Sequence, residues 1–177
     1  MSTSVHKPAG ALVVMGVSGS GKSTLAEALQ KALGWSFQEG DGLHPAANVE
    51  KMSAGIPLTD EDRWPWLDKC RDWLAAMHAQ GHGAILSCSA LKRVYRERLK
   101  SPGFTPLFLY LNVPEERLRD RLIHRSGHYM GVGLLRSQLD TLEIPAQDEH
   151  ALVIDGEMPT EQIVQAVLAK LSAGRQG

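Results

Sequence analysis

A glycine-rich stretch near the N-terminus, GVSGSGKST, has the residue types and the spacing of a phosphate-binding loop. It fits the pattern G-x-x-x-x-G-K-[S/T] from Gly16 to Ser23, and it lies between an apolar run and a helical pattern, as that motif requires. Glycines let backbone N–H groups turn toward phosphate oxygens, and the following helix adds its positive N-terminal end. We therefore expect nucleotide binding by the loop residues Gly16, Val17, Ser18, Gly19, Ser20, Gly21, Lys22, Ser23 and Thr24.

Two side chains of this loop have chemistry of their own. Lys22 can reach the β- and γ-phosphates of a nucleoside triphosphate, so we expect it to be catalytic as well as ATP-binding. The Ser23 hydroxyl is the expected ligand for Mg²⁺. A switch GTPase is disfavoured because the chain has no NKxD motif, and a motor ATPase because no apolar strand ends in the expected aspartate. The second protein contact of Mg²⁺ stays unassigned.

A second group of polar residues lies on a tight bend about twenty residues downstream, in QEGDGLHP. Asp41 stands between Gly40 and Gly42 after an expected strand, whose carboxyl end would share a crevice with the phosphate loop. We expect Asp41 to orient an acceptor hydroxyl for phosphoryl transfer; the alternative is a turn aspartate that bonds its own backbone. His44 could bind a hydroxyl of a polyol substrate, or it could simply pack against Pro45.

Two cations are candidates for binding a negatively charged acceptor. Arg63, in TDEDRWPWL, could bind a substrate carboxylate in bidentate fashion, or it could form an ion pair with Asp60 or Asp62 at a helix start. Lys92 lies where the central expected strand gives way to a helix, again at the edge of the crevice. The neighbouring arginines are expected to form a solvated face; they are Arg93, Arg96 and Arg98.

Three arginines recur at intervals of four, at Arg117, Arg121 and Arg125, which places them on one face of a helix. The helix leads into the glycine-punctuated segment RSGHYMGVG, and we expect residues 124–136 to form a mobile lid. Closure would bring Arg121 and Arg125 onto the nucleotide, with Arg125 acting catalytically on the transferring phosphoryl group. The alternative is pairing on the helix surface with Glu115, Glu116 or Asp120.

These residues need a scaffold that brings distant segments to one edge, and the periodicity of the chain predicts one. Apolar runs of strand length alternate with helical patterns, which indicates a parallel sheet flanked by helices. We expect strands at 11–16, 35–40, 83–91, 106–111 and 151–155, and helices at 23–33, 46–53, 62–79, 92–100, 114–125, 133–143 and 160–172. The predicted fold class is α/β, a three-layer α/β/α domain over residues 11–177 behind a flexible N-terminal tail, residues 1–10.

The composition suits a soluble enzyme and disfavours several other classes. The 177 residues are 43% hydrophobic and 22% charged, which is ordinary for a globular domain, and the formal net charge is −1. A near-neutral chain argues against a protein that binds nucleic acid through a broad basic surface. Cys70 and Cys88 are far apart in sequence and suggest neither a zinc site nor a disulfide framework. No apolar run is long enough for a signal peptide or a membrane span, so we expect a cytoplasmic protein.

Four segments of the sequence together resemble the gluconokinases, small P-loop kinases that phosphorylate D-gluconate. The segments are MGVSGSGKST, GDGLHPAANVEKMSAGIPLTDEDRWPWL, CSALKRVYRERL and GHYMGVGLLRSQLDTLEIP, and they cover nearly all the chain from residue 11 onward. The resemblance implies the P-loop kinase fold of nucleoside-monophosphate and shikimate kinases, with ATP and Mg²⁺ as cofactors, and a homodimer. It also implies that Asp41 is the acceptor-side aspartate and Arg125 the lid arginine.

The implied reaction transfers a phosphoryl group from ATP to the 6-hydroxyl of D-gluconate, an alcohol acceptor, and gives ADP and 6-phospho-D-gluconate. That product would feed the pentose-phosphate or Entner–Doudoroff route. Substrate contacts are expected from Asp41, His44, Arg63 and Lys92. Two alternatives stay open: a kinase for another small polyhydroxy acid such as shikimate, and a regulatory protein that hydrolyses ATP slowly and signals by lid closure.

Overall fold

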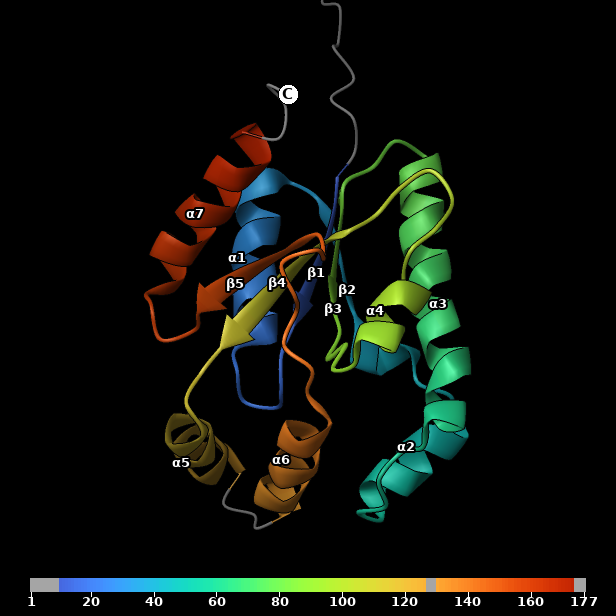
Figure 1. Ribbon diagram of the computed structural model, residues 1–177, viewed down its shortest axis with the longest axis vertical. Coiled ribbons are helices and arrows are strands. Elements are labelled where there is room, and N and C mark those ends of the chain that lie inside the picture. The colour runs from blue at the N-terminus through green and yellow to red at the C-terminus, as the bar shows by residue number, and fades with distance from the viewer. Residues whose placement is uncertain (1–9, 127–129, 174–177) are drawn as a thin grey trace, which may run out of the picture.

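The computed structural model describes residues 10–126 and 130–173, without the side chains of residues 125–132. Its centre is a sheet of five parallel strands in the order β2-β3-β1-β4-β5 (Figure 1). The strands are β1 (Ala11–Met15), β2 (Ser36–Glu39), β3 (Ala84–Ser87), β4 (Leu107–Asn112) and β5 (Ala151–Asp155). The predicted five-stranded parallel sheet is thereby confirmed, while the expected N-terminal tail, apart from residue 10, lies outside the described residues.

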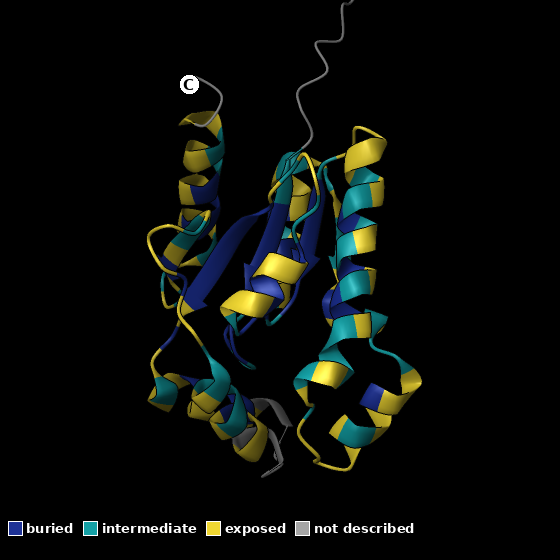
Figure 2. Ribbon diagram, turned by 45° about the vertical axis from the view of Figure 1, so that its right-hand side comes forward, coloured by how far each residue is buried: buried dark blue, intermediate teal, exposed yellow. Residues whose placement is uncertain are grey.

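Helices cover both faces of the sheet, which confirms the predicted three layers. The first layer is α1 (Lys22–Leu33) with α7 (Thr160–Ala173), and the opposite layer is α3 (Asp60–Ala79) with α4 (Arg93–Arg98) (Figure 1). Alternate residues of β1 enter different cores: Leu12 and Val14 pack toward α1 and α7, and Val13 and Met15 toward α3. The central strands β1, β3 and β4 are therefore buried on both faces, as Figure 2 shows.

The remaining elements lie beyond the carboxyl ends of the strands. The short 3₁₀ helix η1 (Gly40–Leu43) and α2 (Ala46–Ser53) follow β2, while α5 (Glu115–Ser126) and α6 (Met130–Thr141) follow β4 (Figure 1). The strand order places β1 and its loop at the centre of this edge, where ligands of open α/β sheets bind. Among the described residues, no helix has the length and apolarity needed to cross a membrane.

Most element boundaries fall within two residues of the prediction; α6 begins three residues early, at Met130, and β3 ends four residues early. α3 begins at Asp60 rather than at residue 62, because a capping box starts it: the Asp62 N–H donates to the Thr59 hydroxyl at 3.1 Å, and the Thr59 N–H donates to the Asp62 carboxylate at 2.9 Å. β3 ends at Ser87, four residues before the predicted end. The chain leaves the sheet there and turns at Ala90, whose φ is 46°.

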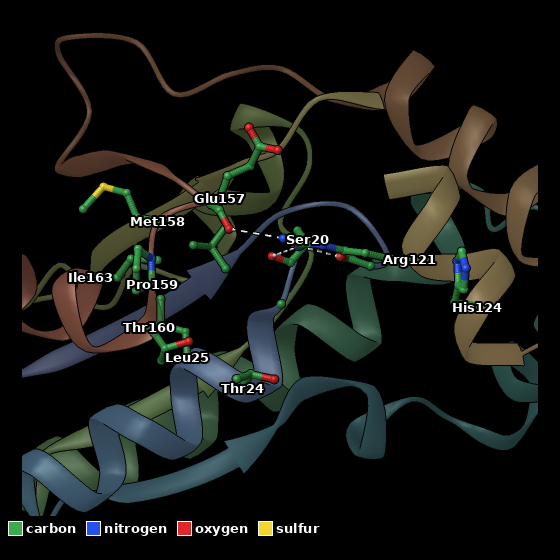
Figure 3. Close-up of a pocket in the computed structure, with 14 residues that line it drawn as sticks. Ser20, Thr24, Leu25, Arg121, His124, Glu157, Met158, Pro159, Thr160 and Ile163 are labelled. Carbon is green, nitrogen blue, oxygen red and sulfur yellow. Dashed lines mark hydrogen bonds between the residues drawn. The ribbon is translucent and has the colours of Figure 1, made fainter. Parts of the chain in front are cut away.

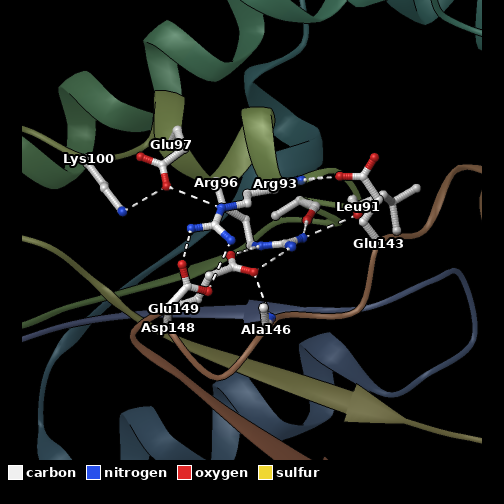
Figure 4. Close-up of polar contacts among 10 residues, drawn as sticks. Leu91, Arg93, Arg96, Glu97, Lys100, Glu143, Ala146, Asp148 and Glu149 are labelled. Carbon is white, nitrogen blue, oxygen red and sulfur yellow. Dashed lines mark hydrogen bonds and ion pairs between the residues drawn. The ribbon is translucent and has the colours of Figure 1, made fainter.

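One arginine of α4 is in the core, so the prediction that it belongs to a solvated face is wrong. The Arg96 side chain is 1% exposed, and its guanidinium forms a two-pronged ion pair with Glu149 at 2.7 and 3.1 Å (Figure 4). Its remaining terminal nitrogen donates to the carbonyl oxygens of Ala90 and Leu91 at 2.8 and 3.2 Å. Arg96 therefore fixes the turn that follows β3.

The other two arginines of this helix are exposed, as predicted. Arg93 pairs with Asp148 at 2.6 Å, and Arg98 pairs with Asp68 at 2.7 Å. Arg96 escaped prediction because α4 has six residues, too few to show a buried stripe, and because its ionic partner is 53 residues further along the chain.

The two cysteines, distant in sequence, meet in the core between α3 and the end of β3. Both are buried and free. The hydrogen bond between their thiols, together with burial, raises the pKa of Cys70. A thiol with a raised pKa stays protonated at neutral pH, so Cys70 is a core residue rather than a nucleophile.

Candidate active site

The loop between β1 and α1 has the conformation of a phosphate cradle. Gly16, Gly19 and Gly21 have positive φ values of 149°, 84° and 98°, which favour glycine. At Gly16 a side chain is also excluded by space, since a Cβ there would lie 2.7 Å from the Ser20 hydroxyl oxygen. These turns lead the loop into the N-terminus of α1, which begins at Lys22.

Two polar groups show that the loop suits an anion. The Lys22 ammonium donates to the carbonyl oxygens of Gly16 and Val17 at 3.0 Å each, so the side chain is folded over the loop. The Ser20 hydroxyl is buried, and no group in the described part of the chain hydrogen-bonds to it. Leaving a buried hydroxyl without a partner costs stability, and a phosphate oxygen would supply the missing acceptor. The predicted nucleotide loop therefore fits the phosphates of ATP.

Ser23 and Thr24 occupy the first turn of α1, and both are exposed. Ser23 directly follows Lys22, next to the place where the phosphates would lie, and its hydroxyl is the kind of hard oxygen ligand that Mg²⁺ takes. No group of three or more His, Cys, Asp or Glu side chains in residues 10–124 and 133–173 could hold a metal ion. These residues suit a Mg²⁺ held mainly by nucleotide phosphates and by one hydroxyl.

A cavity of about 550 Å³ opens on one side of the loop, between α5 and the segment that joins β5 to α7 (Figure 3). The Arg121 side chain extends from α5 into it. Its guanidinium donates to the carbonyl oxygens of Gly19 and Ser20 at 3.1 and 3.3 Å, and to that of Gly156 at 3.5 Å. Arg121, predicted as a nucleotide contact, thus ties the loop to the far wall of the cavity, which includes Gly156, Glu157, Met158, Pro159 and Thr160.

A second cavity, of about 240 Å³, lies on the other side of the loop. Ser18 and Lys22 line it from the loop, and Asp41, His44 and Arg63 line it from the segment that follows β2. Three of the four predicted substrate contacts are therefore brought to one place, with the loop lysine in the same wall. Because the loop separates the two cavities, a nucleotide in the first would present its terminal phosphate to an acceptor in the second.

Asp41 is held on the η1 bend at the carboxyl end of β2. The bend requires Gly40, because a Cβ there would collide with the carbonyl oxygen of Ser87, and the Gly40 carbonyl accepts a hydrogen bond from the Trp66 indole at 2.8 Å. The Asp41 carbonyl accepts from the His44 N–H at 3.4 Å, whereas its carboxylate receives no hydrogen bond from any described residue. The structure thus does not show the alternative in which the carboxylate bonds its own backbone.

His44 is packed and lines the cavity at the same time. Its ring is stacked on Trp66, with centroids 4.1 Å apart and planes inclined by 15°. The amide nitrogen of Asn48 lies 3.2 Å from its Nδ1. Burial lowers the pKa of His44, the Asp41 carboxylate raises it and Arg63 lowers it again, and the net value is below the ordinary 6.5. His44 is therefore neutral at neutral pH.

Arg63 lines the cavity and is supported from behind by Tyr95 and Asp60. Its Nη1 donates to the Tyr95 hydroxyl at 2.7 Å and lies 3.8 Å from the Asp60 carboxylate, to which that hydroxyl donates in turn. Burial and the bond to Asp60 raise the pKa of Tyr95 to about 12. The Lys92 ammonium lies 3.3 Å from Asp60, and Lys92 is not among the described residues that line the cavity.

Three residues make site contacts that the sequence did not indicate. Asn48 holds the His44 ring, Trp66 supports that ring, and the Gln138 side-chain oxygen accepts a hydrogen bond from the Ser18 N–H at 2.6 Å. Gln138 thereby joins α6 to the phosphate loop. The sequence around it shows only an apolar spacing typical of a packed helix, which gives no signal for this contact.

The other two arginines of the predicted helix stripe are Arg117 and Arg125. Arg117 pairs with Glu157 at 3.0 Å instead of with an acidic residue of its own helix. Arg125 is in the last turn of α5, and its side chain lies outside the described part of the structure, as do residues 127–129 after it. The catalytic role of Arg125 therefore stays a prediction.

Sequence and fold comparisons place this chain among known kinases. A family model described as an AAA domain matches residues 12–133. A gluconokinase of Gluconobacter oxydans (strain 621H) is 51% identical over 92% of this chain and 91% of its own length, and the thermosensitive gluconokinase of Escherichia coli (strain K12) is 42% identical over 89% and 87%. A crystal structure of a gluconokinase from Sinorhizobium meliloti 1021 has a TM-score of 0.84 and 45% identity, covering 96% of this chain and 97% of that one.

Proposed function

We propose that this chain, which belongs to the gluconokinase family, transfers the γ-phosphoryl group of ATP to the 6-hydroxyl of D-gluconate, giving 6-phospho-D-gluconate and ADP. One observation carries the proposal for this site: the two cavities meet at the phosphate loop, and Lys22 and Asp41 line the same one. A hydroxyl held at Asp41 is then close to the loop lysine that binds the transferring group. Such positioning accounts for most of the catalysis of phosphoryl transfer.

The larger cavity takes the base and ribose of ATP, and the loop takes its phosphates. Lys22 neutralises charge on the β- and γ-phosphates, and the buried Ser20 hydroxyl finds its missing partner there. Ser23 is the residue that would hold Mg²⁺, which when bound neutralises further phosphate charge. Arg121, already joined to the loop, adds a fixed positive charge beside the phosphates.

The smaller cavity takes the sugar acid in an extended form. Asp41 accepts a hydrogen bond from the 6-hydroxyl, orients it for in-line attack and takes its proton. At the other end of the substrate, Arg63 binds the carboxylate with a guanidinium that Tyr95 and Asp60 already hold in place. Lys92 would reach the substrate only by leaving Asp60, so Arg63 is the primary carboxylate contact and Lys92 a secondary one.

The lid, the assembly and the location complete the proposal. Residues 124–136 form the lid and Arg125 contacts the transferring phosphoryl group on closure; in support, His124 lines the first cavity and Leu134 the second. The chain acts as a cytoplasmic homodimer on a small-molecule substrate, without nucleic acid or membrane, in keeping with its family resemblance and its near-neutral charge.

The substrate assignment is tested by a coupled assay of ADP release with D-gluconate, with shikimate, with other sugar acids and without acceptor. Rapid release with D-gluconate alone is expected, with phosphorus NMR of the product showing a 6-phosphate. Equal release without acceptor would contradict the proposal and favour the regulatory ATPase. Faster release with shikimate or another acid would assign a different acceptor. Lys22→Met is the control, since it should abolish release with every acceptor.

A further inference from the structure

The His44 ring is fixed in position by two contacts. One face is stacked on Trp66, whose indole N–H is in turn anchored to the Gly40 carbonyl at 2.8 Å. Its Nδ1 faces the Asn48 side chain at 3.2 Å. Nε2, on the other edge of the ring, receives no hydrogen bond from any described residue, and His44 lines the acceptor cavity. The ring therefore has one nitrogen, Nε2, left to contact a ligand.

The orientation of the Asn48 amide is settled by its second partner. Its side chain lies 2.9 Å from the main-chain carbonyl oxygen of Asp62, and a carbonyl oxygen can only accept. The Asn48 atom at this distance must therefore be the nitrogen, because an oxygen there would repel. The same nitrogen directs its other hydrogen at Nδ1 of His44, so Nδ1 must offer a lone pair.

We infer that Asn48 fixes His44 as the neutral tautomer with its hydrogen on Nε2, which makes His44 a hydrogen-bond donor to a hydroxyl oxygen of the polyhydroxy acid acceptor. Asn48 is then a positioning residue, and His44 is the contact that determines specificity. The identity of the acceptor rests on the proposed function, whereas the tautomer does not.

Asp41 and His44 offer the acceptor opposite kinds of hydrogen bond from one short segment. A carboxylate only accepts, and the Nε2–H of a neutral imidazole only donates. A polyol matches this pair, because each hydroxyl can donate to the one and accept from the other. An acceptor without a hydroxyl near His44 would leave the Nε2–H unpaired in a partly buried site, which lowers affinity.

The charges around the ring agree with a single proton on it. Burial and Arg63 lower the pKa of His44 and outweigh the Asp41 carboxylate, which raises it. Asn48 also contacts the main chain of Asp62, whose carboxylate is neutralised by Lys51 in an ion pair of 2.7 Å. The ring nitrogens therefore carry one hydrogen between them at neutral pH, and the contact with the Asn48 amide determines which nitrogen bears it.

The tautomer can be measured without any turnover, by long-range proton–nitrogen NMR correlations of the ¹⁵N-labelled chain. The spectrum should show Nδ1 of His44 as the bare nitrogen and Nε2 as the protonated one at and above neutral pH. The signals are assigned by their loss in His44→Gln. A hydrogen found on Nδ1 would overturn the inference, whatever the acceptor is.

Asn48→Asp tests the consequence for binding, because it exchanges a donor for an acceptor of the same shape. The new carboxylate accepts from Nδ1–H, so the neutral ring would present a bare Nε2, while the protonated ring would keep a donor there. The KM for D-gluconate should rise about three- to tenfold with increasing pH in this variant but not in the wild type, with kcat and the KM for ATP little changed.

A constant ratio between the variant and the wild type at all pH values would contradict the inference. Asn112→Asp is the matched control: it makes the same chemical change at an exposed position at the end of β4, which is not among the described residues that line the acceptor cavity. Its KM for D-gluconate should stay at the wild-type value at every pH.

Because Asn48 is 3% exposed, a second pair of variants covers the case in which Asn48→Asp does not fold. His44→Gln keeps an amide donor near the Nε2 position, and His44→Phe keeps a ring on Trp66 without a donor. The KM for D-gluconate should rise about three- to tenfold for Phe and much less for Gln, and equal effects would overturn the inference. A wild-type chain that does not phosphorylate D-gluconate would refute the proposed function alone, since the NMR result stands apart from it.

Discussion

Lys22 and Asp41 line the acceptor cavity from two different segments, and the backbone places both of them. Lys22 follows the glycine turns of the phosphate loop, and Asp41 follows Gly40, whose close approach to Ser87 fixes the bend. The conformation of each segment therefore depends on glycines rather than on the functional side chain. Substitutions of the side chains should change the chemistry and leave the local fold in place.

Replacement of Asp41 by Asn should lower kcat by about 10²- to 10⁴-fold while the KM for ATP changes little. An amide cannot take the hydroxyl proton, and ATP lies on the other side of the loop. Steady-state ADP release at saturating D-gluconate measures the effect, and Asp72→Asn, at an exposed position of α3, is the control. Turnover near the wild-type rate would remove Asp41 from the mechanism.

Arg63 should act on the substrate carboxylate and on nothing else in the reaction. Arg63→Ala is expected to raise the KM for D-gluconate by about 10- to 100-fold, and Arg63→Lys should recover only part of it, because an ammonium cannot form the bidentate pair. Sorbitol, which has the hydroxyls but no carboxylate, should be phosphorylated equally poorly by all three proteins. A comparable loss with sorbitol would show that Arg63 supports the cavity instead of binding the carboxylate.

The lowered pKa of His44 makes a prediction about stability and pH. The unfolded chain titrates near 6.5 and the folded chain below it, so the unfolded state binds more protons in the interval. The contribution of a neutral His44 is thus fully present above pH 6.5 and is lost as the pH falls through the lowered pKa. Urea unfolding between about pH 8 and about pH 5 should show the stability of the wild type falling relative to His44→Gln. A relative gain on acidification would contradict this assignment.

Among the elements, α4 depends on a buried ion pair for its place. Arg96 and Glu149 are 1% and 6% exposed, and Arg96 also holds the carbonyls of the turn that carries Ala90 at a positive φ. Ser89 and Leu91 on either side of that residue line the acceptor cavity. The pair therefore connects the stability of α4 with the shape of the site.

Removal of one partner should destabilise the fold strongly. Arg96→Met or Glu149→Leu alone should lower the free energy of unfolding by about 3–5 kcal/mol, because the other group is left buried without its partner. The double variant Arg96→Met with Glu149→Leu should recover much of this loss. Urea denaturation of the full cycle measures the coupling, with Arg93→Met at the exposed neighbouring pair as the control. Additive losses would show that the two side chains act independently.

Elements of this fold could be predicted where their signal is local. Short stretches of sequence predict the glycine loop, the apolar strands and the range of α2, and the structure confirms all three. The end of β3 was placed too late, because the apolar run continues after the backbone has turned away. Contacts between distant segments have no local signal in the sequence: Asn48 contacts Asp62, 14 residues away, and Gln138 contacts Ser18, 120 residues away.

At the scale of the whole molecule, the phosphate loop separates the nucleotide cavity from the acceptor cavity. The arrangement favours direct transfer, in which both ligands are bound together when the phosphoryl group passes. Initial rates at varied ATP and D-gluconate should give intersecting double-reciprocal lines, as for a ternary complex. Parallel lines, with exchange between ATP and ADP in the absence of gluconate, would indicate a phosphorylated enzyme and contradict this arrangement.

The acceptor cavity draws half of its wall from one continuous stretch of chain, residues 41–66, while none of the described residues that line the nucleotide cavity comes from it. The stretch leaves the sheet at the end of β2 and rejoins the core through Trp66 on α3. A segment with two fixed ends can be exchanged as a unit, by recombination in evolution or by grafting in the laboratory. Within this fold, a new substrate can therefore be acquired without rebuilding the machinery that handles ATP.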